Sequence, residues 1–247
     1  MGNKASLEIT IPVYNEEKEL EKNINRLYFF CKKNMGSYNW QITVADNASV
    51  DKTGEIGKKL EKLYKEVRYI KFEKKGRGRA IKKIWFLNRM DICCYMDIDL
   101  STDLKHLPSL IGSLSDGYDI AAGSRLLTKS KVIERSLKRE FLSKAYNLLI
   151  KVFFQTKFSD AQCGFKAVTR KVVTNLIPYI LDNGWFMDSE LLIMAEKLNY
   201  KIYEEPVVWR DNPGSTVRIL PTAMGDLAGV LRLLATKPWN KLGLQKQ

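Results

Sequence analysis

The stretch "DICCYMDIDL", residues 91–100, decides how this chain folds. Its first part is an apolar run of strand length, which ends in two aspartates, Asp97 and Asp99, with one isoleucine between them. Residues two apart in a strand point to the same side, so both carboxylates are expected to face one place. Like charges repel unless a cation lies between them, and oxygen ligands suit Mg²⁺ or Mn²⁺. The stretch therefore predicts a divalent metal site.

A helix cap is the alternative explanation of the same acids. Asp99 or Ser101 would then cap a helix that begins near Asp103, and Asp97 would be an ordinary loop acid. The position at the end of a strand favours the metal site, because ligands of α/β sheets bind beyond the carboxyl ends of the strands.

Outward from this stretch, apolar runs alternate with amphipathic segments. Runs rich in β-branched residues at 7–13, 41–46 and 67–72 predict three earlier strands, each followed by a helical pattern. This alternation implies right-handed βαβ units and a parallel sheet. We therefore predict an α/β fold with a Rossmann-like, mostly parallel central sheet flanked by helices.

The second half of the chain has a less regular pattern. Strands are expected at 118–125, 162–170 and 201–209, the second of them with a tight glycine, and amphipathic helices at 135–154 and 221–235. No internal repeat and no low-complexity linker interrupts the sequence, so a single domain is predicted.

The bulk composition limits the partners without selecting one. The chain has 41 Lys and Arg residues against 28 Asp and Glu, which gives a formal net charge of +13. Such a surplus favours a polyanion: a nucleic acid, an anionic membrane surface or a phosphorylated ligand. Four cysteines without a C-x-x-C pair indicate neither a zinc site nor a disulfide framework. No signal-peptide core and no run of about 18 apolar residues is found, so neither a signal peptide nor a spanning helix is expected.

Two further polar segments are candidates for ligand contacts. Asp46 ends the second predicted strand and is placed to accept hydrogen bonds from a nucleotide's base or ribose; the alternative is a turn that the aspartate itself stabilises. The segment "KKGRGRAIKK", residues 74–83, is basic and glycine-rich at a helix start. Its backbone N–H groups are placed to face an anion, unless it is only a solvated loop.

Several motifs, taken in order, resemble those of the family 2 glycosyltransferases with the GT-A fold. They are "IPVYNEE" (11–17), "VADNASVDKT" (44–53), "DID" (97–99), "AAGSR" (121–125) and "AQCGFKA" (161–167). Within the family the chain resembles the polyprenyl-phosphate hexosyltransferase branch, which includes dolichyl-phosphate glucosyltransferases and mannose synthases. The segments "DAQCGFKAVTR" (160–170), "WFMDSELL" (185–192) and "VVWRDNPGST" (207–216) look closer to the glucosyltransferases.

The resemblance implies an inverting, metal-dependent hexosyltransferase of protein glycosylation. It would move glucose or mannose from UDP-glucose or GDP-mannose to polyprenyl (dolichyl) phosphate, with Mg²⁺ or Mn²⁺ as cofactor. One domain over residues 1–247 would comprise a nucleotide-sugar-binding half, 1–125, and an acceptor-binding half, 126–247. Three alternatives stay open: transfer to a sugar hydroxyl in glycan or polysaccharide synthesis, a nucleotidyltransferase, and a basic nucleic-acid-binding module.

The resemblance also implies roles for individual residues. Asp97 and Asp99 would hold the cation and the donor diphosphate, with the Ile98 backbone close by. Asp188 would orient the sugar, serve as the base of a hydroxyl transferase, or simply cap a helix. The nucleoside would be held by Pro12, Tyr14, Glu16 and Asp46, and the phosphates of donor and acceptor by Arg125, Arg139, Ser143, Arg210 and Arg218.

The sequence departs from the family pattern at two places. The usual "DDGS" is "ADNAS" here, and Ser101 stands where mannose synthases often carry Gln, which leaves the third metal contact open. The chain's one histidine, His106, is interpreted as a surface or helix-packing residue. A lipid phosphate is already an anionic nucleophile at neutral pH, so its glycosylation needs no general base.

Two basic amphipathic segments favour contact with a membrane surface. Residues 138–154 and 221–235 each combine an apolar band with basic residues, which suits the headgroup layer of a bilayer; the alternative is a core-facing helix. We therefore expect a peripheral protein on the cytoplasmic face of a membrane that binds no nucleic acid. A separate membrane subunit that anchors it is left open.

Overall fold

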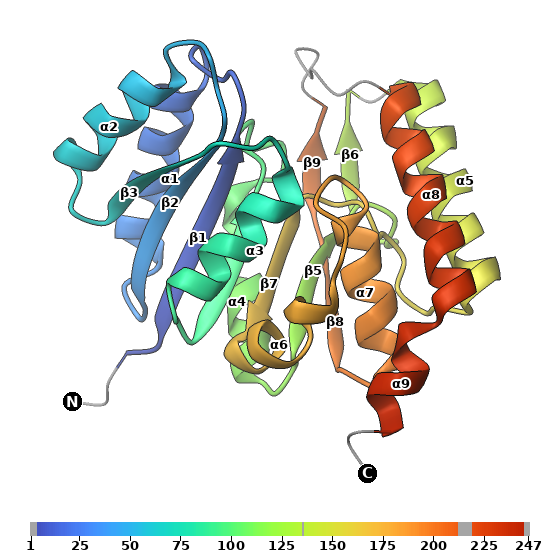
Figure 1. Ribbon diagram of the computed structural model, residues 1–247. Coiled ribbons are helices and arrows are strands. Elements are labelled where there is room, and N and C mark those ends of the chain that lie inside the picture. The colour runs from blue at the N-terminus through green and yellow to red at the C-terminus, as the bar shows by residue number, and fades with distance from the viewer. Residues whose placement is uncertain (1–3, 135, 212–218, 245–247) are drawn as a thin grey trace.

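A seven-stranded sheet forms the centre of the computed structural model, which describes residues 4–134, 136–211 and 219–244 (Figure 1). The strand order is β3-β2-β1-β4-β7-β5-β8, and every neighbouring pair is parallel except the two that involve β7. The predicted α/β fold with a mostly parallel sheet is thus confirmed. The strands are β1 (Ser6–Val13), β2 (Asn39–Asn47), β3 (Val67–Phe72), β4 (Ile92–Met96), β5 (Ile120–Ser124), β7 (Phe165–Thr169) and β8 (Ile202–Pro206).

Helices cover both faces of the sheet because the strands are apolar on both sides. Cys94 and Met96 of β4 pack into one core with α1, α2 and α4, whereas Cys93 and Tyr95 pack into a second core with α3, α6 and α7. The adjacent cysteines therefore serve opposite faces, as the alternation of side chains along a strand requires. These helices are α1 (Leu20–Asn34), α2 (Thr53–Leu63), α3 (Arg77–Leu87), α4 (Leu107–Ser115), α6 (Arg170–Asn175) and α7 (Met187–Lys197).

The remaining elements lie toward one edge of the sheet. Helices α5 (Leu137–Phe154) and α8 (Ile219–Thr236) run side by side, and α9 (Pro238–Leu244) follows (Figure 1). A small parallel sheet joins β6 (Lys131–Ile133) to β9 (Val208–Arg210), and two short 3₁₀ helices are η1 (Leu104–His106) and η2 (Ile177–Tyr179). Among the described helices, none has the length and apolar character needed to cross a membrane.

Two sequence predictions about strands need correction. The fourth strand ends at Met96, and the Leu100 N–H donates to the Asp97 carbonyl to close a turn. Asp97 and Asp99 therefore lie on this turn, where the two-residue spacing of a strand does not determine their directions. The strand predicted at 201–209 is divided into β8 and β9 at Val207. The Val207 N–H donates to the Ser124 carbonyl, and the Val207 carbonyl accepts from the Lys131 N–H.

Candidate functional site

The carboxyl ends of β1, β2 and β4 lie at the upper edge of the sheet in Figure 1, and polar residues follow each of these ends in the chain. The loops after β1 and β2 are joined: the Asn15 N–H donates to the Ser49 hydroxyl (2.9 Å) and the Glu16 N–H to the Thr53 hydroxyl (2.8 Å). Burial, together with the charges of Asp99 and other acids including Asp97, raises the pKa of Glu16 to about 7. The structure thus brings three predicted site acids, Glu16, Asp97 and Asp99, into one electrostatic environment.

Asp99 is held by the turn that follows β4. Its carboxylate accepts from the Ser101 N–H (3.0 Å) and hydroxyl (2.7 Å), which fixes its direction. Burial and the negative charge of Asp97 raise the pKa of Asp99. The 3₁₀ helix η1 is capped by Asp103, which accepts from the Lys105 N–H, so Asp99 is not its cap. A partly buried pair of acids that repel each other is an arrangement that a divalent cation would relieve.

Asp97 is packed closely against the loop that leads into β7. The Asp97 N–H donates to the Gly164 carbonyl (3.2 Å), and a Cβ at position 164 would lie 1.8 Å from Asp97 Oδ2. Only glycine leaves the space that the carboxylate occupies. The tight glycine predicted from the sequence is therefore a requirement of the acid at position 97.

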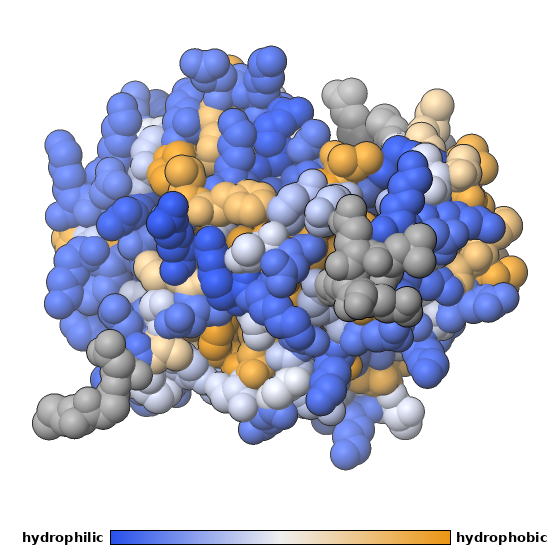
Figure 2. Space-filling model, turned by 60° about the horizontal axis from the view of Figure 1, so that its bottom comes forward, coloured by the Kyte–Doolittle hydropathy of each residue, from blue (hydrophilic) through white to orange (hydrophobic). Residues whose placement is uncertain are grey.

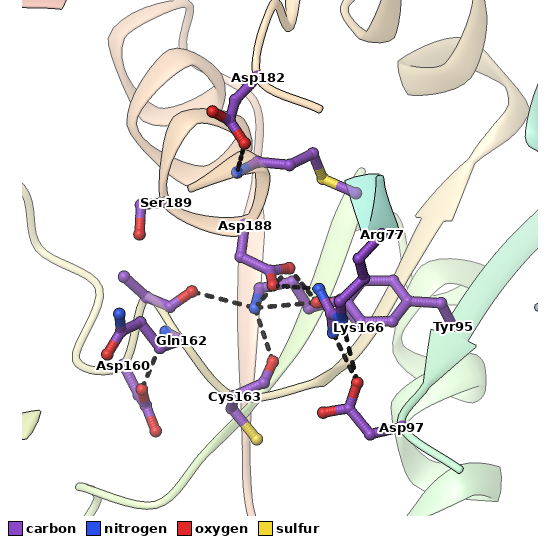
Figure 3. Close-up of polar contacts among 12 residues, drawn as sticks. Arg77, Tyr95, Asp97, Asp160, Gln162, Cys163, Lys166, Asp182, Asp188 and Ser189 are labelled. Atoms are coloured by element: carbon purple, nitrogen blue, oxygen red, sulfur yellow. Dashed lines mark hydrogen bonds and ion pairs between the residues drawn. The ribbon is translucent and has the colours of Figure 1, made fainter. Parts of the chain in front are cut away.

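Arg77, at the start of α3, links Asp97 to Asp188 (Figure 3). Its Nη2 lies 2.7 Å from Asp97 Oδ1 and its Nη1 lies 2.8 Å from Asp188 Oδ2. The guanidinium also lies 4.8 Å from the ring centroids of Tyr95 and Trp185. Two carboxylates and two aromatic faces offset the cost of burying this cation.

Asp188 lies between two buried cations. Besides Arg77, the ammonium of Lys166 is 3.3 Å from Asp188 Oδ1, and the Tyr95 hydroxyl donates to the same oxygen. Burial alone would raise the pKa of Asp188, but the charges of Lys166 and Arg77 outweigh it and hold this pKa below its usual value. Asp188 is not the N-cap of α7, because that position is occupied by Phe186.

The arginines predicted to bind phosphate have acidic partners. Arg125 makes a bidentate pair with Asp160, at 2.7 and 2.9 Å, and its guanidinium lies 5.5 Å from the Trp209 ring centroid. Arg125 and other favourable partners outweigh the effect of burial and lower the pKa of Asp160 to about 2. Arg139 Nη1 lies 2.7 Å from Asp211 Oδ1.

The other predicted acceptor residues are less well placed. Arg210 is exposed, with Nε 3.9 Å from Glu134 Oε2. Ser143 is buried, and its hydroxyl is one of the buried polar groups without a hydrogen-bond partner in the described part of the chain. Arg218 lies outside the described residues.

The residues predicted to bind the nucleoside lie at the carboxyl ends of β1 and β2 or directly after β1. Asp46 is fully buried and accepts from the Tyr69 hydroxyl (2.5 Å) and the Ser49 N–H (2.8 Å), so it stabilises the turn 46–49. The ammonium of Lys75 lies 3.4 Å from the centre of the Tyr14 ring. Pro12 lies in β1 and Ile98 is buried in the core. A nucleoside role for these residues stays a prediction.

Sequence reasoning missed four charged residues of this site. Arg77 lies in the basic segment 74–83, where backbone N–H groups were expected to do the binding. Asp160 and Lys166 lie in the motif "DAQCGFKAVTR" (160–170), which carries the family resemblance but no charge pairing of its own, and Asp211 follows β9. The tight glycine of that motif was the available signal, because it indicated a close approach of some other group.

His106 lies in η1 and packs this short helix against the sheet, as the helix-packing interpretation predicts. Its Nε2 accepts from the Val208 N–H (3.0 Å), so Nδ1 carries the proton and faces Glu205 Oε1 at 2.9 Å. The two ring nitrogens therefore connect η1, which follows the turn that carries Asp99, to β9 through Val208 and to β8 through Glu205.

The residues present fit a divalent cation with few protein ligands. Within residues 4–134, 136–211 and 219–244, no group of three or more His, Cys, Asp or Glu side chains is arranged to hold a metal. Asp97 and Asp99 alone would thus supply the protein's carboxylates. Mg²⁺ and ions like it commonly bind through one or two carboxylates plus substrate phosphates and water.

Comparison with known sequences places these motifs in a family. A family model described as "Glycosyl transferase family 2" matches residues 8–177. The chain is 31% identical over 226 residues to the glycosyltransferase AglD of Haloferax volcanii, covering 91% of this chain but only 36% of AglD. It is 30% identical to the dolichyl-phosphate beta-glucosyltransferase of Saccharomyces cerevisiae, covering 86% of this chain and 69% of that protein, and 29% identical to that of Homo sapiens, covering 85% and 68%.

Solved structures show the same fold. Glucosyl-3-phosphoglycerate synthase from Mycobacterium tuberculosis, in complex with Mn²⁺, UDP-glucose and phosphoglyceric acid, matches with a TM-score of 0.65 at 16% identity, covering 97% of this chain and 80% of that one. Its complex with UDP matches with a TM-score of 0.68 at 18% identity, covering 94% and 79%. At this identity the likeness shows the fold alone.

Proposed function

Because this chain belongs to glycosyl transferase family 2, we propose that it moves a hexose from a nucleoside diphosphate sugar to polyprenyl (dolichyl) phosphate, with inversion at the anomeric carbon. The names of the yeast and human relatives support glucose as the sugar and dolichyl phosphate as the acceptor. The observation that carries the proposal is the pair Asp97–Asp99 at the end of β4, next to buried arginines that are already oriented by carboxylates.

Asp97 and Asp99 would hold Mg²⁺ or Mn²⁺ and, through it, the donor diphosphate. A divalent ion bound there would supply charge neutralisation for the departing nucleoside diphosphate. The Mn²⁺ in a neighbour of the same fold supports this choice of ion. Arg77 holds one oxygen of Asp97, and Ser101 holds Asp99. These contacts fix both carboxylates before substrate arrives, so little reorganisation is needed during transfer.

The state of Asp188 favours a phosphate acceptor over a sugar hydroxyl. A general base must take a proton from a hydroxyl acceptor, but the carboxylate of Asp188 is engaged by Arg77, Lys166 and Tyr95 and its pKa is lowered. His106 is also engaged at both ring nitrogens. A phosphate monoester is an anionic nucleophile at neutral pH and needs neither group. Positioning and charge neutralisation then suffice for catalysis.

Helices α5 and α8 would bring the enzyme to the surface of the membrane that holds the acceptor. Both expose apolar side chains, and Figure 2 shows hydrophobic surface along the edge where these helices lie. Lys144 and Lys151 of α5 line a groove of about 670 Å³ that also contains Arg125 and Leu148. An apolar band with basic neighbours suits peripheral contact with an anionic, cytoplasmic leaflet. The exposed apolar residues are Phe141, Leu142, Leu148, Val152 and Phe153 on α5 and Met224, Leu227 and Leu231 on α8.

A donor panel tests the proposal. The purified protein is incubated with UDP-glucose or GDP-mannose, Mg²⁺ or Mn²⁺, and a polyprenyl phosphate in vesicles, and the labelled hexose is extracted into organic solvent. We expect transfer from UDP-glucose that depends on the lipid phosphate. The matched control replaces the lipid phosphate with the corresponding polyprenol. Transfer to the polyprenol, or to a sugar hydroxyl without lipid phosphate, would contradict the acceptor class.

A further inference from the structure

We propose that Asp211 is a specificity-determining residue that occupies the phosphate-binding face of Arg139 until the phosphate of the acceptor replaces it. The proposal rests on the function proposed above, together with the role that the family resemblance implies for Arg139 as a phosphate-binding residue. In this proposal an acidic residue competes with the acceptor for Arg139. Only an acceptor with sufficient negative charge can then bind the arginine.

The pair is fixed from both sides. Arg139 Nη1 lies 2.7 Å from Asp211 Oδ1, with the arginine side chain 32% exposed and the aspartate side chain 12% exposed. Arg139 lies in the first turn of α5, and its N–H donates to the capping hydroxyl of Ser136. The Asp211 N–H donates to the Ile133 carbonyl at the end of β6 (3.0 Å). The contact therefore joins α5 to the small β6–β9 sheet.

The pair also lies beside the proposed cation site. The Arg210 N–H donates to the carbonyl of Ser101, on the turn that follows Asp99. Trp209 lines a narrow recess together with Asp97 and Asp99. The charge of Asp211 is among the influences that raise the pKa of Asp99, after burial and Asp97. An acceptor phosphate that approaches the donor at this site therefore meets Arg139 while the arginine is held by Asp211.

Charge decides which ligand displaces the carboxylate. A guanidinium presents a planar set of donors that binds phosphate oxygens in pairs, and a phosphate monoester carries up to two negative charges against the single charge of Asp211. Such a ligand can replace the aspartate on Arg139. An acceptor with a neutral hydroxyl has no charge with which to compete, so the Arg139–Asp211 ion pair stays formed. The partly exposed position of the pair keeps the exchange reversible, because solvent screens its attraction.

Neutralising the aspartate should therefore strengthen acceptor binding. In the variant Asp211→Asn the amide keeps an oxygen that can accept from Arg139 but loses the competing charge. We expect the KM for a polyprenyl phosphate to fall by roughly threefold to tenfold, the change that about 0.7–1.4 kcal/mol produces, with the KM for UDP-glucose unchanged. Binding of a short prenyl phosphate, measured by calorimetry, should tighten by the same factor.

Two variants act as controls. Asp211→Glu keeps the charge and should restore the acceptor KM toward that of the wild type. Glu21 on α1 forms an exposed ion pair with Lys59 on α2. The variant Glu21→Gln removes one negative charge from this pair, so it reports the effect of net charge alone. It should leave both KM values unchanged.

The outcomes separate this inference from the proposed function. If the wild-type protein glycosylates no lipid phosphate, the proposed function fails and this inference fails with it. If the wild type is active but Asp211→Asn raises or leaves unchanged the acceptor KM, only the inference is overturned. A fall in kcat with no change in acceptor KM would also overturn it, since Asp211 would then serve the reacting groups rather than exclude ligands.

Discussion

The two sides of the site differ in how their charges are balanced. At the ends of β1 and β4, Glu16 and Asp99 are acids whose pKa values are raised by burial and by neighbouring acids. On the side of β5, β7 and α7, Asp160 and Asp188 are more deeply buried, yet their pKa values are lowered by arginine and lysine partners. In the proposed function, the first side would receive a cation that arrives with the donor. The acids of the second side are already neutralised by arginine and lysine side chains of the protein.

Arg77 connects the two sides, and its removal should give the largest effect on stability. The variant Arg77→Met leaves the buried Asp188 and the partly exposed Asp97 without their shared partner. We expect the free energy of unfolding at pH 7 to fall by about 3–5 kcal/mol, measured by denaturant titration. The matched control is Lys59→Met, which breaks an exposed pair with Glu21 and should cost at most about 1 kcal/mol. Equal losses in both variants would contradict the special status of Arg77.

Glu8 sharpens the comparison, because it is a buried acid whose hydrogen-bond partners in the described part of the chain are neutral: Thr10, Gln41, Thr43 and Asn88. Burial raises the pKa of Glu8 to about 7, although these hydrogen bonds oppose the shift. A raised folded-state pKa contributes stability that is full below about pH 4.5 and is lost as the pH rises through about 7.

The variant Glu8→Gln should remove that part of the pH dependence. Between pH 5 and pH 8 the wild type should lose about 1–3 kcal/mol more of its unfolding free energy than the variant does, since one pKa unit corresponds to about 1.4 kcal/mol. Thermal and denaturant unfolding at both pH values measure the difference. Parallel stability–pH curves would show that Glu8 is ionised in the folded protein across this range.

Ser101 should give the smallest stability effect and test how Asp99 is oriented. The variant Ser101→Ala removes the hydroxyl that donates to Asp99 but keeps the backbone N–H that donates to the same carboxylate. We expect a loss of about 0.5–1.5 kcal/mol in stability, together with weaker activation by Mn²⁺ in the transfer assay. Activation identical to that of the wild type would mean that the backbone contact alone orients Asp99.

The sequence predicted the sheet well because its signal is local. Alternating apolar runs placed β1, β2 and β3 within a few residues, and the position of Asp97 and Asp99 after a strand brought them to the carboxyl edge. The end of β4 was missed because apolar periodicity does not report the turn that the Leu100 N–H closes by donating to the Asp97 carbonyl. The division of β8 from β9 was missed because it depends on a hydrogen bond between distant backbone groups, from the Val207 N–H to the Ser124 carbonyl.

The ion pairs of the site were not predictable from the same pattern. Arg77 meets Asp97 across 20 positions and Asp188 across 111, and Arg125 meets Asp160 across 35. Periodicity and composition carry no information about such pairs. Asp188 was therefore left with three possible roles in the sequence, and only its contacts with Arg77 and Lys166 distinguish an anchored carboxylate from a base.

The most direct test of the account is binding of Mn²⁺ to the whole protein. Calorimetry or electron paramagnetic resonance in the presence of UDP-glucose should show one ion bound by the wild type, and binding weakened by at least about tenfold in Asp99→Asn. Glu21→Gln, which removes a charge from an exposed pair with Lys59, should bind as the wild type does. Undiminished Mn²⁺ binding and unchanged transfer in the variant Asp97→Asn/Asp99→Asn would contradict the central claim that these carboxylates hold the ion.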